Sequence, residues 1–566
     1  MFTSILIANR GEIAARIART CRELGIGVVA VHSTEDADSP VVRMADQVVC
    51  VGPPPPKQSY LNAAAILEAA LQTGAEALHP GYGFLSEDPD LAELCEAYGI
   101  AFIGPPGAVM AKLGDKSTAR QLMADAGLPL LPGSIRPLAN ATEAVELAEG
   151  IGYPVIIKAV AGGGGRGMRV VRNTAEFDEA YRSTRATAQA IFGDGRVYVE
   201  RYLDHTRHVE VQVLADRYGN AVHLGERDCS VQRRHQKLIE ETPAPGLDPP
   251  TAAAIRAAAV RGTLAAGYVG AGTFEFLVDG HGDFSFMEVN CRIQVEHPVT
   301  EMVTGVDLVE EQIRVAAGEP LRLRQDDIQP RGVAIECRVN AEDPRRDFAP
   351  APGELMEFEP PAGPFVRTDT YGRTGGRISA HYDSLLAKTV VWAPDRDRAI
   401  AKMRRALREF LVAGPGVHTT VDFLQDVLAH PLFRRNRHTT GLVDLMLSPM
   451  NRQEANDMPH IDVNNRILTL INTFTVSPDN QERLMEILDD ATKNVMSRFP
   501  GFISASLHAS LDKTRVANYA QWRTEEDFLA AIRHPNFRPH FEACERIAEA
   551  DPQLYWVYAT EEAPSR

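Results

Sequence analysis

The sequence predicts a multidomain chain that combines α/β and α+β architecture and ends in a separate ferredoxin-like α+β domain. Strands and helices alternate over residues 1–112, a glycine-rich strand–loop–strand segment lies within residues 130–203, and a β-α-β-β-α-β order follows a polar stretch near residue 450. The 566 residues exceed what one hydrophobic core organises. At roughly 150 residues per domain, three or four units are expected.

Composition and charge exclude several classes of protein. Acidic residues outnumber basic ones by 76 to 59, and the formal charge of −17 would repel a phosphate backbone, so we expect no nucleic-acid partner. The apolar start of the chain ends at Asn9, Arg10 and Glu12, too early for a signal-peptide core or a membrane span. Seven cysteines without a Cys-x-x-Cys pair indicate reduced thiols. These features predict a cytoplasmic protein without membrane association.

The N-terminal region begins as a β-α-β unit. Residues 4–8 form a short apolar strand, residues 10–24 have helical periodicity, and residues 28–31 form a second strand. The alternation continues through strands near residues 77–78 and 101–103. It predicts a Rossmann-like, doubly wound parallel sheet over residues 1–112.

A glycine-rich hairpin is expected next. Strands at residues 155–158 and 169–171 flank the loop Ala161 to Met168. Bare backbone N–H groups can approach anionic oxygens, so this hairpin suits a mobile flap, residues 130–203, over a ligand. The spacing fits neither the Walker nor the dinucleotide pattern, and a hairpin without a ligand is the alternative. Residues 204–447 then mix strands and helices, as in an α+β domain.

The last hundred residues have a different organisation. Residues 449–465 are polar and lack apolar periodicity, which predicts a linker within residues 448–463 before a domain at 464–566. We expect a strand at 467–476, a helix at 479–498, strands at 501–509 and 515–522, a helix from Thr524, and a last strand near 554–558. This order is typical of the ferredoxin-like fold.

Residues 286–298 carry an unusual density of polar side chains for a strand. Alternation would place Glu288, Asn290, Arg292, Gln294 and Glu296 on one face. Glu275 could pair with Glu288 across neighbouring strands, and two such hard carboxylates suit Mg²⁺ held against phosphates. An exposed polar strand face is the alternative interpretation.

Six motifs give the first 447 residues a clear resemblance. They are Ala8 to Ala14, His79 to Glu87, the glycine loop, Gly225 to Ser230, Arg292 to Glu301, and Glu336 to Pro344. In this order they resemble the biotin carboxylases, which implies an N-terminal domain at 1–112, an ATP-grasp domain at 113–318 and a C-terminal domain at 319–447. Another ATP-grasp ligase, such as a carbamoyl-phosphate synthetase-like enzyme, is the runner-up, and the Arg292 to Glu296 segment argues against it.

The resemblance implies specific residue roles. The implied ATP-binding residues are Lys116, Lys158, Gly162, Gly163, Gly164, Gly165, Gly167, Glu200, Tyr202, Leu203, His208, Gln232, His235 and Leu277. Glu275, Glu288 and Asn290 would bind Mg²⁺, with Mn²⁺ as an alternative. Lys237, Arg292, Gln294, Val295, Arg338 and Tyr82 would bind bicarbonate and biotin. Glu296 resembles the base that deprotonates bicarbonate, and Lys237, Arg292 and Arg338 complete the catalytic set.

A missing motif predicts the partners. Biotin carrier domains present biotin on the lysine of an Ala-Met-Lys-Met hairpin, and no such motif occurs here, since Ala401, Lys402 and Met403 lie in a predicted helix in the wrong order. We therefore expect the biotin carrier protein and the carboxyltransferase to be separate chains. The resemblance further implies a homodimer that supplies malonyl-CoA through an acyl-CoA carboxylase.

The tail, residues 460–566, resembles the antibiotic biosynthesis monooxygenases, whose members form dimeric α-β barrels. Pro500 to Phe502 and Asn518 to Trp522 carry this resemblance, and Asn518 and Trp522 have the spacing of pocket residues in cofactor-free, quinone-forming members. Phe528 stands where some members have tyrosine, and Arg538 is the nearest candidate for an arginine. The tail is therefore expected to be an oxygenase or, alternatively, a non-catalytic dimerisation or binding module.

Overall fold

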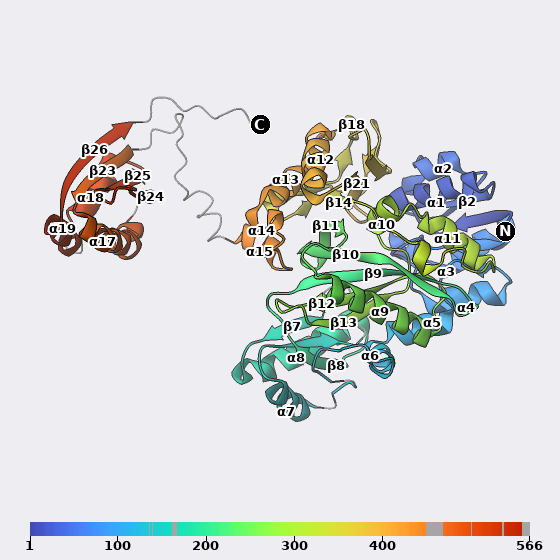
Figure 1. Cartoon of the computed structure of the whole chain (residues 1–566). Coiled ribbons are helices and arrows are strands. Elements are labelled where there is room, and N and C mark those ends of the chain that lie inside the picture. Colours follow the sequence, from blue (N-terminus) through green and yellow to red (C-terminus); the bar gives the residue numbers. More distant parts are fainter. Residues whose placement is uncertain are drawn as a thin grey trace. The chain divides into compact units, whose positions relative to one another are not determined.

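The computed structural model describes residues 1–134, 136–138, 140–160, 167–448, 468–499, 501–534 and 537–556. The chain divides into two compact units, Met1–Val443 and Asp444–Arg566, and each is described by itself (Figure 1). The predicted linker, apart from Ser448, and the glycine residues 162–165 lie outside the described residues.

The first unit begins with a five-stranded parallel sheet in the order β3-β2-β1-β4-β5. Ile5 and Ile7 of β1 pack into one apolar cluster and Leu6 packs into a second one on the other side, because successive strand residues face opposite sides. The predicted doubly wound sheet is confirmed. Its elements are β1 (Ser4–Ile7), α1 (Gly11–Glu23), β2 (Gly27–Ser33), α2 (Pro40–Met44), β3 (Gln47–Gly52), α3 (Ala63–Thr73), β4 (Ala77–His79), α4 (Pro89–Ala97) and β5 (Ala101–Phe102).

The flap region contains a three-stranded antiparallel sheet in the order β7-β6-β8. The predicted hairpin is present as β6 and β7. Gly167, at the start of β7, has a φ of +71°, and a Cβ there would lie 3.0 Å from the Cβ of Ala159, so the position favours glycine. The flap region is preceded by α5 (Gly107–Gly114) and α6 (Lys116–Asp125), and its elements are α7 (Ala141–Ile151), β6 (Val155–Ala159), β7 (Met168–Val171), α8 (Thr174–Phe192) and β8 (Val197–Arg201).

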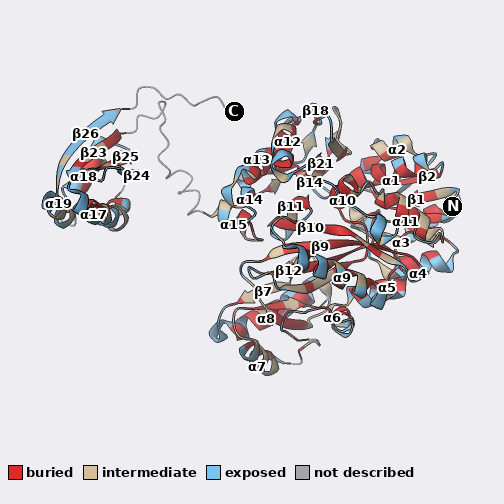
Figure 2. Ribbon diagram, viewed as in Figure 1, coloured by how far each residue is buried: buried red, intermediate tan, exposed pale blue. Residues whose placement is uncertain are grey.

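An eight-stranded antiparallel sheet forms the centre of the first unit, in the order β13-β12-β9-β10-β11-β14-β21-β19. Because β11 pairs with β14, this sheet joins residues on both sides of the predicted boundary at 318. Its strands are β9 (Arg207–Ala215), β10 (Ala221–Arg233), β11 (Gln236–Thr242), β12 (Gly270–Val278), β13 (Phe284–Asn290), β14 (Val333–Asn340), β19 (Val366–Thr370) and β21 (Leu385–Ala393). Figure 2 shows that β9 and β10 are buried along almost their whole length, although both carry charged residues.

Helices and short strands surround the central sheet. The helices are α9 (Pro249–Ala266), α10 (His297–Thr304), α11 (Leu308–Ala316), α12 (Arg396–Glu409), α13 (Val421–Ala429), α14 (Pro431–Arg434) and α15 (Leu442–Leu447). The short strands are β15 (Glu342–Asp343), β16 (Ala349–Pro350), β17 (Gly353–Glu354), β18 (Glu357–Glu359), β20 (Arg377–Ile378) and β22 (Leu411–Ala413). Lys402 lies within α12, as the sequence predicts.

The second unit is the predicted ferredoxin-like domain, with a four-stranded sheet in the order β24-β25-β23-β26. Its elements are β23 (Leu468–Val476), α17 (Gln481–Asn494), β24 (Phe502–Ala509), β25 (Arg515–Trp522), α18 (Glu525–Ile532), α19 (Arg538–Glu545) and β26 (Ala548–Trp556).

Two details of the tail differ from the sequence prediction. The helix predicted from Thr524 is divided into α18 and α19. The last strand begins at Ala548 and not near Leu554, because β26 pairs with β23 over its whole length. The charged residues and Pro552 at its start have the composition of a loop, and only the long-range pairing makes them a strand.

Candidate active site

Two carboxylates on adjacent strands form one part of the site. Glu275 of β12 and Glu288 of β13 are register partners, as predicted. Asn290 Nδ2 donates to Glu275 Oε1 at 2.9 Å, and Glu288 Oε2 lies 4.0 Å from Lys116 Nζ. Burial, together with the charge of Glu275, raises the pKa of Glu288. Glu275, Glu288 and Asn290 offer oxygen donors of the kind that Mg²⁺ prefers, so these residues fit that ion.

Lys237 of β11 is surrounded by carboxylates. Its Nζ donates to Glu210 at 2.6 Å, to Glu296 at 2.7 Å and to Glu275 at 2.9 Å. Burial alone would lower the pKa of this ammonium, but the acidic neighbours hold it well above its ordinary value. Lys237 therefore stays charged and links the carboxylate pair to Glu296.

Glu296 is completely buried between two cations. Besides its contact with Lys237, its Oε2 accepts from Arg338 Nη2 at 2.8 Å, and Arg338 Nε donates to Glu240 at 2.6 Å. Burial would raise the pKa of Glu296, but the charges of Lys237, Arg338 and Arg227 hold it well below its usual range. Burial raises the pKa of Glu240 to about 7 against the opposing charge of Arg338.

The segment from Arg292 to Glu296 is not a continuation of β13, so the prediction of one long strand was wrong. The strand ends at Asn290, and Glu296 is the N-cap of α10, whose second residue is Pro298. Proline has no N–H for a sheet and is favoured in the first helical turn, which explains the change.

The predicted polar side chains still converge on one place. Arg292 Nη2 donates to Asn290 at 3.0 Å, Arg292 Nη1 donates to Gln294 at 2.7 Å, and Arg292 Nε donates to Glu87 at 3.0 Å. Gln294 is buried and its Nε2 lies 3.4 Å from Glu275 Oε1. The polar side chains that were expected on one face of a strand are therefore brought together by a turn of the backbone.

The predicted nucleotide residues lie on several elements around these carboxylates. Lys158 Nζ donates to Glu200 at 2.6 Å, and Arg120 also pairs with Glu200. His208 Nε2 lies 2.9 Å from Glu275, and burial would lower its pKa, but that carboxylate raises it. Leu277 is the register partner of His208.

The remaining predicted residues of the first unit are also described. Tyr202 and Leu203 directly follow β8, Gln232 is the residue before Arg233 at the end of β10, and His235 lies in the turn that follows. Lys388 Nζ donates to the carbonyl oxygen of Val295 at 2.8 Å and pairs with Glu12 at 3.0 Å. Tyr82 donates its hydroxyl hydrogen to the same Glu12.

Sequence reasoning missed several charged residues of this network: Glu210, Arg227, Glu240, Lys388 and Glu12. Arg227 and Glu210 are fully buried and 2.5 Å apart. The alternation of polar residues in β9 could have indicated Glu210, because Glu210 and Gln212 share one face of that strand just as polar residues do in β13.

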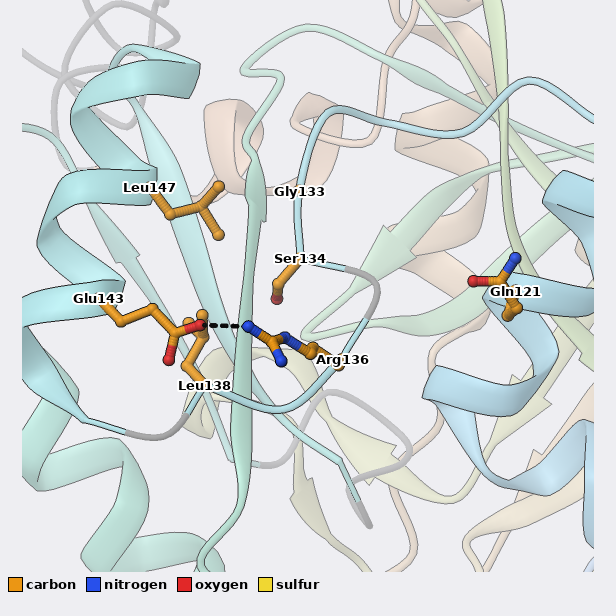
Figure 3. A pocket seen from close by; sticks show the side chains of 7 residues that line it. All are labelled: Gln121, Gly133, Ser134, Arg136, Leu138, Glu143 and Leu147. Atoms are coloured by element: carbon orange, nitrogen blue, oxygen red, sulfur yellow. Dashed lines mark hydrogen bonds and ion pairs between the residues drawn. The ribbon is translucent and has the colours of Figure 1, made fainter.

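A cavity of about 480 Å³ lies beside Glu200, because its lining residue Gly133 pairs with Glu200 in an isolated β-bridge (Figure 3). Gln121, Gly133, Ser134, Arg136, Leu138, Glu143 and Leu147 line it, and Arg136 donates to Glu143 at 3.3 Å. None of the predicted site residues is among them.

The tail residues Asn518 and Trp522 share the helix-covered face of β25. Asn518 lies opposite Asn472 of β23, and Trp522 lies opposite Leu468. Asn472 Oδ1, Asn518 Oδ1 and Trp522 Nε1 are buried and have no hydrogen-bond partner in the described part of the chain. Phe528 packs on Trp522 with ring centroids 5.7 Å apart. The side chain of Arg538 is 81% exposed and pairs with Glu542, so the structure does not bring it together with the other two.

Comparisons with known families follow the same division of the chain. Residues 1–110 match the biotin carboxylase N-terminal domain, residues 115–324 the ATP-binding domain of the carbamoyl-phosphate synthase L chain, and residues 336–445 the biotin carboxylase C-terminal domain. Residues 467–543 match the antibiotic biosynthesis monooxygenase family. With the central sheet and its carboxylates, the first three matches define an ATP-grasp enzyme.

Relatives of known name and structure identify the family. A biotin carboxylase from Nostoc sp. is 53% identical over 445 residues, which cover 79% of this chain and 99% of that protein. Biotin carboxylase 1 of Bacillus subtilis is 51% identical, over 78% of this chain and 98% of the relative. A biotin carboxylase structure from Campylobacter jejuni, in a β-γ-ATP complex, superposes with a TM-score of 0.77 at 48% identity, over 79% of this chain and 99% of that one.

This chain therefore belongs to the biotin carboxylase family and is a ligase that carboxylates biotin. The carbamoyl-phosphate synthetase-like alternative shares the central match but not the two flanking ones. The tail is an additional domain of the monooxygenase family. Among the described residues, no helix has the length and apolar character to cross a membrane.

Proposed function

We propose that this chain uses MgATP and bicarbonate to carboxylate biotin carried by a separate protein. A bicarbonate oxygen attacks the γ-phosphorus of ATP, which gives carboxyphosphate and ADP. Carboxyphosphate then releases CO₂ and phosphate, the released phosphate takes the proton of the ureido nitrogen of biotin, and that nitrogen attacks CO₂. The observation that carries this proposal is the convergence of Lys237, Arg292, Glu296 and Arg338 beside the Glu275–Glu288 pair.

Bicarbonate would bind among Lys237, Arg292, Gln294 and the backbone of Val295. Lys237 and Arg292 supply positive charge and several N–H donors, and the planar guanidinium suits a carboxylate-like anion. A structure of the Hydrogenobacter thermophilus 2-oxoglutarate carboxylase biotin carboxylase domain, a dimer in complex with MgADP, ADP and bicarbonate, superposes with a TM-score of 0.76 at 46% identity, over 79% of this chain and 98% of that one. It supports this choice of substrates.

Glu296 would accept the proton of bicarbonate. Its low pKa keeps it ionised at all working pH values, so it is always in the proton-accepting form. It is a weak base while Lys237 and Arg338 both contact it. A bound bicarbonate that shares these cations would raise the basicity of Glu296 as the phosphoryl group is transferred.

Arg338 would stabilise the negative charge on biotin when its ureido nitrogen loses a proton. Arg338 Nη2 lies 2.8 Å from Glu296 Oε2, so bicarbonate and biotin would lose their protons in neighbouring positions. Tyr82, beside Glu12 and Lys388, would complete this side of the site.

ATP would bind between the flap region and the central sheet, where Lys116, Lys158 and His208 can neutralise phosphate charge. The chain from Glu200 to Leu203 would contact the adenine. Glu275, Glu288 and Asn290 would hold Mg²⁺, or Mn²⁺, which supplies positive charge at the β- and γ-phosphates.

The partners follow from the missing biotin-bearing motif. A biotin carrier protein and a carboxyltransferase would act as separate chains, and the product would be used to make malonyl-CoA. We propose a cytoplasmic homodimer, which the seven free cysteines and the dimeric biotin carboxylase domain among the relatives support.

Purified chain tests the main proposal. It should hydrolyse ATP in a bicarbonate-dependent reaction that accelerates on addition of free biotin or a biotinylated carrier, and its intact mass should show no attached biotin. Covalent biotin on this chain would contradict the separate carrier.

For the tail, cofactor-free oxygenation of an anthrone-like phenol is a second candidate function. The unpartnered Asn518 Oδ1 and Trp522 Nε1 favour it, since a buried acceptor and a buried donor can hold a phenolic ligand. Such substrates form stabilised carbanions that react with oxygen directly. In the full chain, Asn518→Ala and Trp522→Phe should reduce oxygen uptake with anthrones. Absence of uptake in the wild type would favour the dimerisation module.

A further inference from the structure

The hairpin of β10 and β11 carries three proposed site residues: Gln232 and Lys237 on its strands and His235 on its strained turn. Gln232 and Lys237 are register partners, and Arg234 and His235 form the two-residue turn between the strands. Their φ values are +48° and +66°, although neither is glycine. Two-residue turns of this kind normally contain asparagine and glycine, because side chains disfavour positive φ. Contacts outside the turn must stabilise it.

A second strained pair of residues faces the turn. Asp347 and Phe348, between β15 and β16, have φ values of +55° and +58°. The Asp347 carboxylate lies 2.8 Å from Arg234 Nη2 and also pairs with Arg233. Arg233 Nη2 donates to the Asp347 carbonyl oxygen at 2.9 Å.

Aromatic packing connects this contact to the C-terminal part of the first unit. The Arg233 guanidinium lies 4.3 Å from the centre of the Phe348 ring, and Phe348 packs edge-on against Phe423 of α13 at 5.0 Å. Phe348 is buried. Asp347 and Phe348 therefore join the turn to α13, which belongs to a different region of the sequence.

Lys237, two residues after His235, is held differently from the turn itself. Lys237 is fixed by Glu210, Glu275 and Glu296, whereas the turn with His235 is exposed. Loss of the Asp347 contact would therefore change the turn and leave Lys237 in place.

We propose that Asp347 is a positioning residue that holds the Arg234–His235 turn, so that His235 reaches the ATP phosphates. This inference rests on the proposed role of His235 in ATP binding. It predicts a specific defect: weaker use of ATP with unchanged use of bicarbonate.

The test compares Asp347→Ala with Asp38→Ala, a matched control in which an exposed aspartate also pairs with two arginines, Arg43 and Arg373. Asp347→Ala should raise the KM for ATP about tenfold, less than the roughly 10²-fold cost of a 1 Å misplacement. The KM for bicarbonate and the Tm should remain close to wild type, and Asp38→Ala should change none of these.

A second substitution tests the strain directly. Arg234→Gly in the Asp347→Ala background should lower the raised KM for ATP most of the way back to the wild-type value, because glycine adopts positive φ without a steric cost. A wild-type KM for ATP in Asp347→Ala, or an equal rise in both KM values with a lower Tm, would overturn the proposal. His235→Ala distinguishes the proposed role of His235 in ATP binding from the positioning role of Asp347. An unchanged KM for ATP in His235→Ala would contradict the role of His235. A raised KM for ATP in His235→Ala, together with a wild-type value in Asp347→Ala, would contradict only the positioning role of Asp347.

Discussion

Glu296→Gln is the most direct test of the proposed mechanism. The amide keeps the shape of the carboxyl group but cannot accept a proton, and general-base catalysis is typically worth about 10²–10⁴-fold in rate, or about 3–5 kcal/mol of activation free energy. We therefore expect carboxylation to fall by this factor while the KM for ATP stays near the wild-type value.

The structure also predicts that the Glu296→Gln variant folds. Removing one partner of a buried ion pair is strongly destabilising when the other charge is left unpaired. Here Lys237 keeps Glu210 and Glu275, and Arg338 keeps Glu240. Its Tm should therefore stay close to that of the wild type.

Carboxybiotin formation with free biotin measures the rate, calorimetric titration with ATP measures binding, and thermal unfolding checks the fold. Glu311→Gln is the matched control, since Glu311 is buried outside the site and its partner Arg322 keeps Glu310. Turnover within about tenfold of wild type in folded Glu296→Gln would remove this residue from the role of base.

Three further substitutions test other parts of the site. Glu275→Gln should raise the Mg²⁺ concentration for half-maximal ATP hydrolysis at least about tenfold, and an unchanged Mg²⁺ dependence would contradict the metal assignment. Arg338→Lys keeps the charge but loses the planar fork, so biotin carboxylation should fall more than the bicarbonate-dependent ATP hydrolysis measured without biotin. Glu336 is buried, neither carboxylate oxygen has a partner among the described residues, and burial raises its pKa well above its ordinary value against the opposing charge of Lys388. The pKa of Glu336 is higher in the folded state than in the unfolded state, so the folded wild type binds more protons than the unfolded chain. The free energy of unfolding of the wild type therefore falls, relative to that of Glu336→Gln, as pH rises above the unfolded-state pKa. The Tm difference, variant minus wild type, should thus be larger at about pH 8 than at about pH 6, and a smaller difference would refute the argument.

The sequence predicted the parts of the fold that local pattern determines. The alternation near β1 and α1, the hairpin of β6 and β7, and the pairing of Glu275 with Glu288 are all visible in residue spacing. The start of β26 was not predictable, because its pairing with the end of β23 depends on residues more than seventy positions earlier, Val476 opposite Ala548. The end of β13 was missed because polar alternation continues past Asn290 while the backbone turns towards α10.

Recognisable motifs led to the candidate site residues that the structure brings together, and the residues that were missed are those whose importance depends on burial. Glu210 and Glu240 resemble ordinary surface acids in the sequence, and only the three-dimensional sheet shows that each is completely buried beside a cation. Long-range pairing, not local composition, gives such residues their importance.

In the free protein the Lys237 ammonium already contacts three carboxylates, so its positive charge is balanced before any anion binds. At the proposed site, an incoming bicarbonate would not neutralise a bare cation but would replace a glutamate at an occupied one, so much of the electrostatic gain of binding would be cancelled by the contact that is given up. Such exchange favours a modest affinity and rapid release. It would also discriminate by charge, because CO₂ is neutral and could not replace a carboxylate beside the Lys237 ammonium, whereas the bicarbonate anion could.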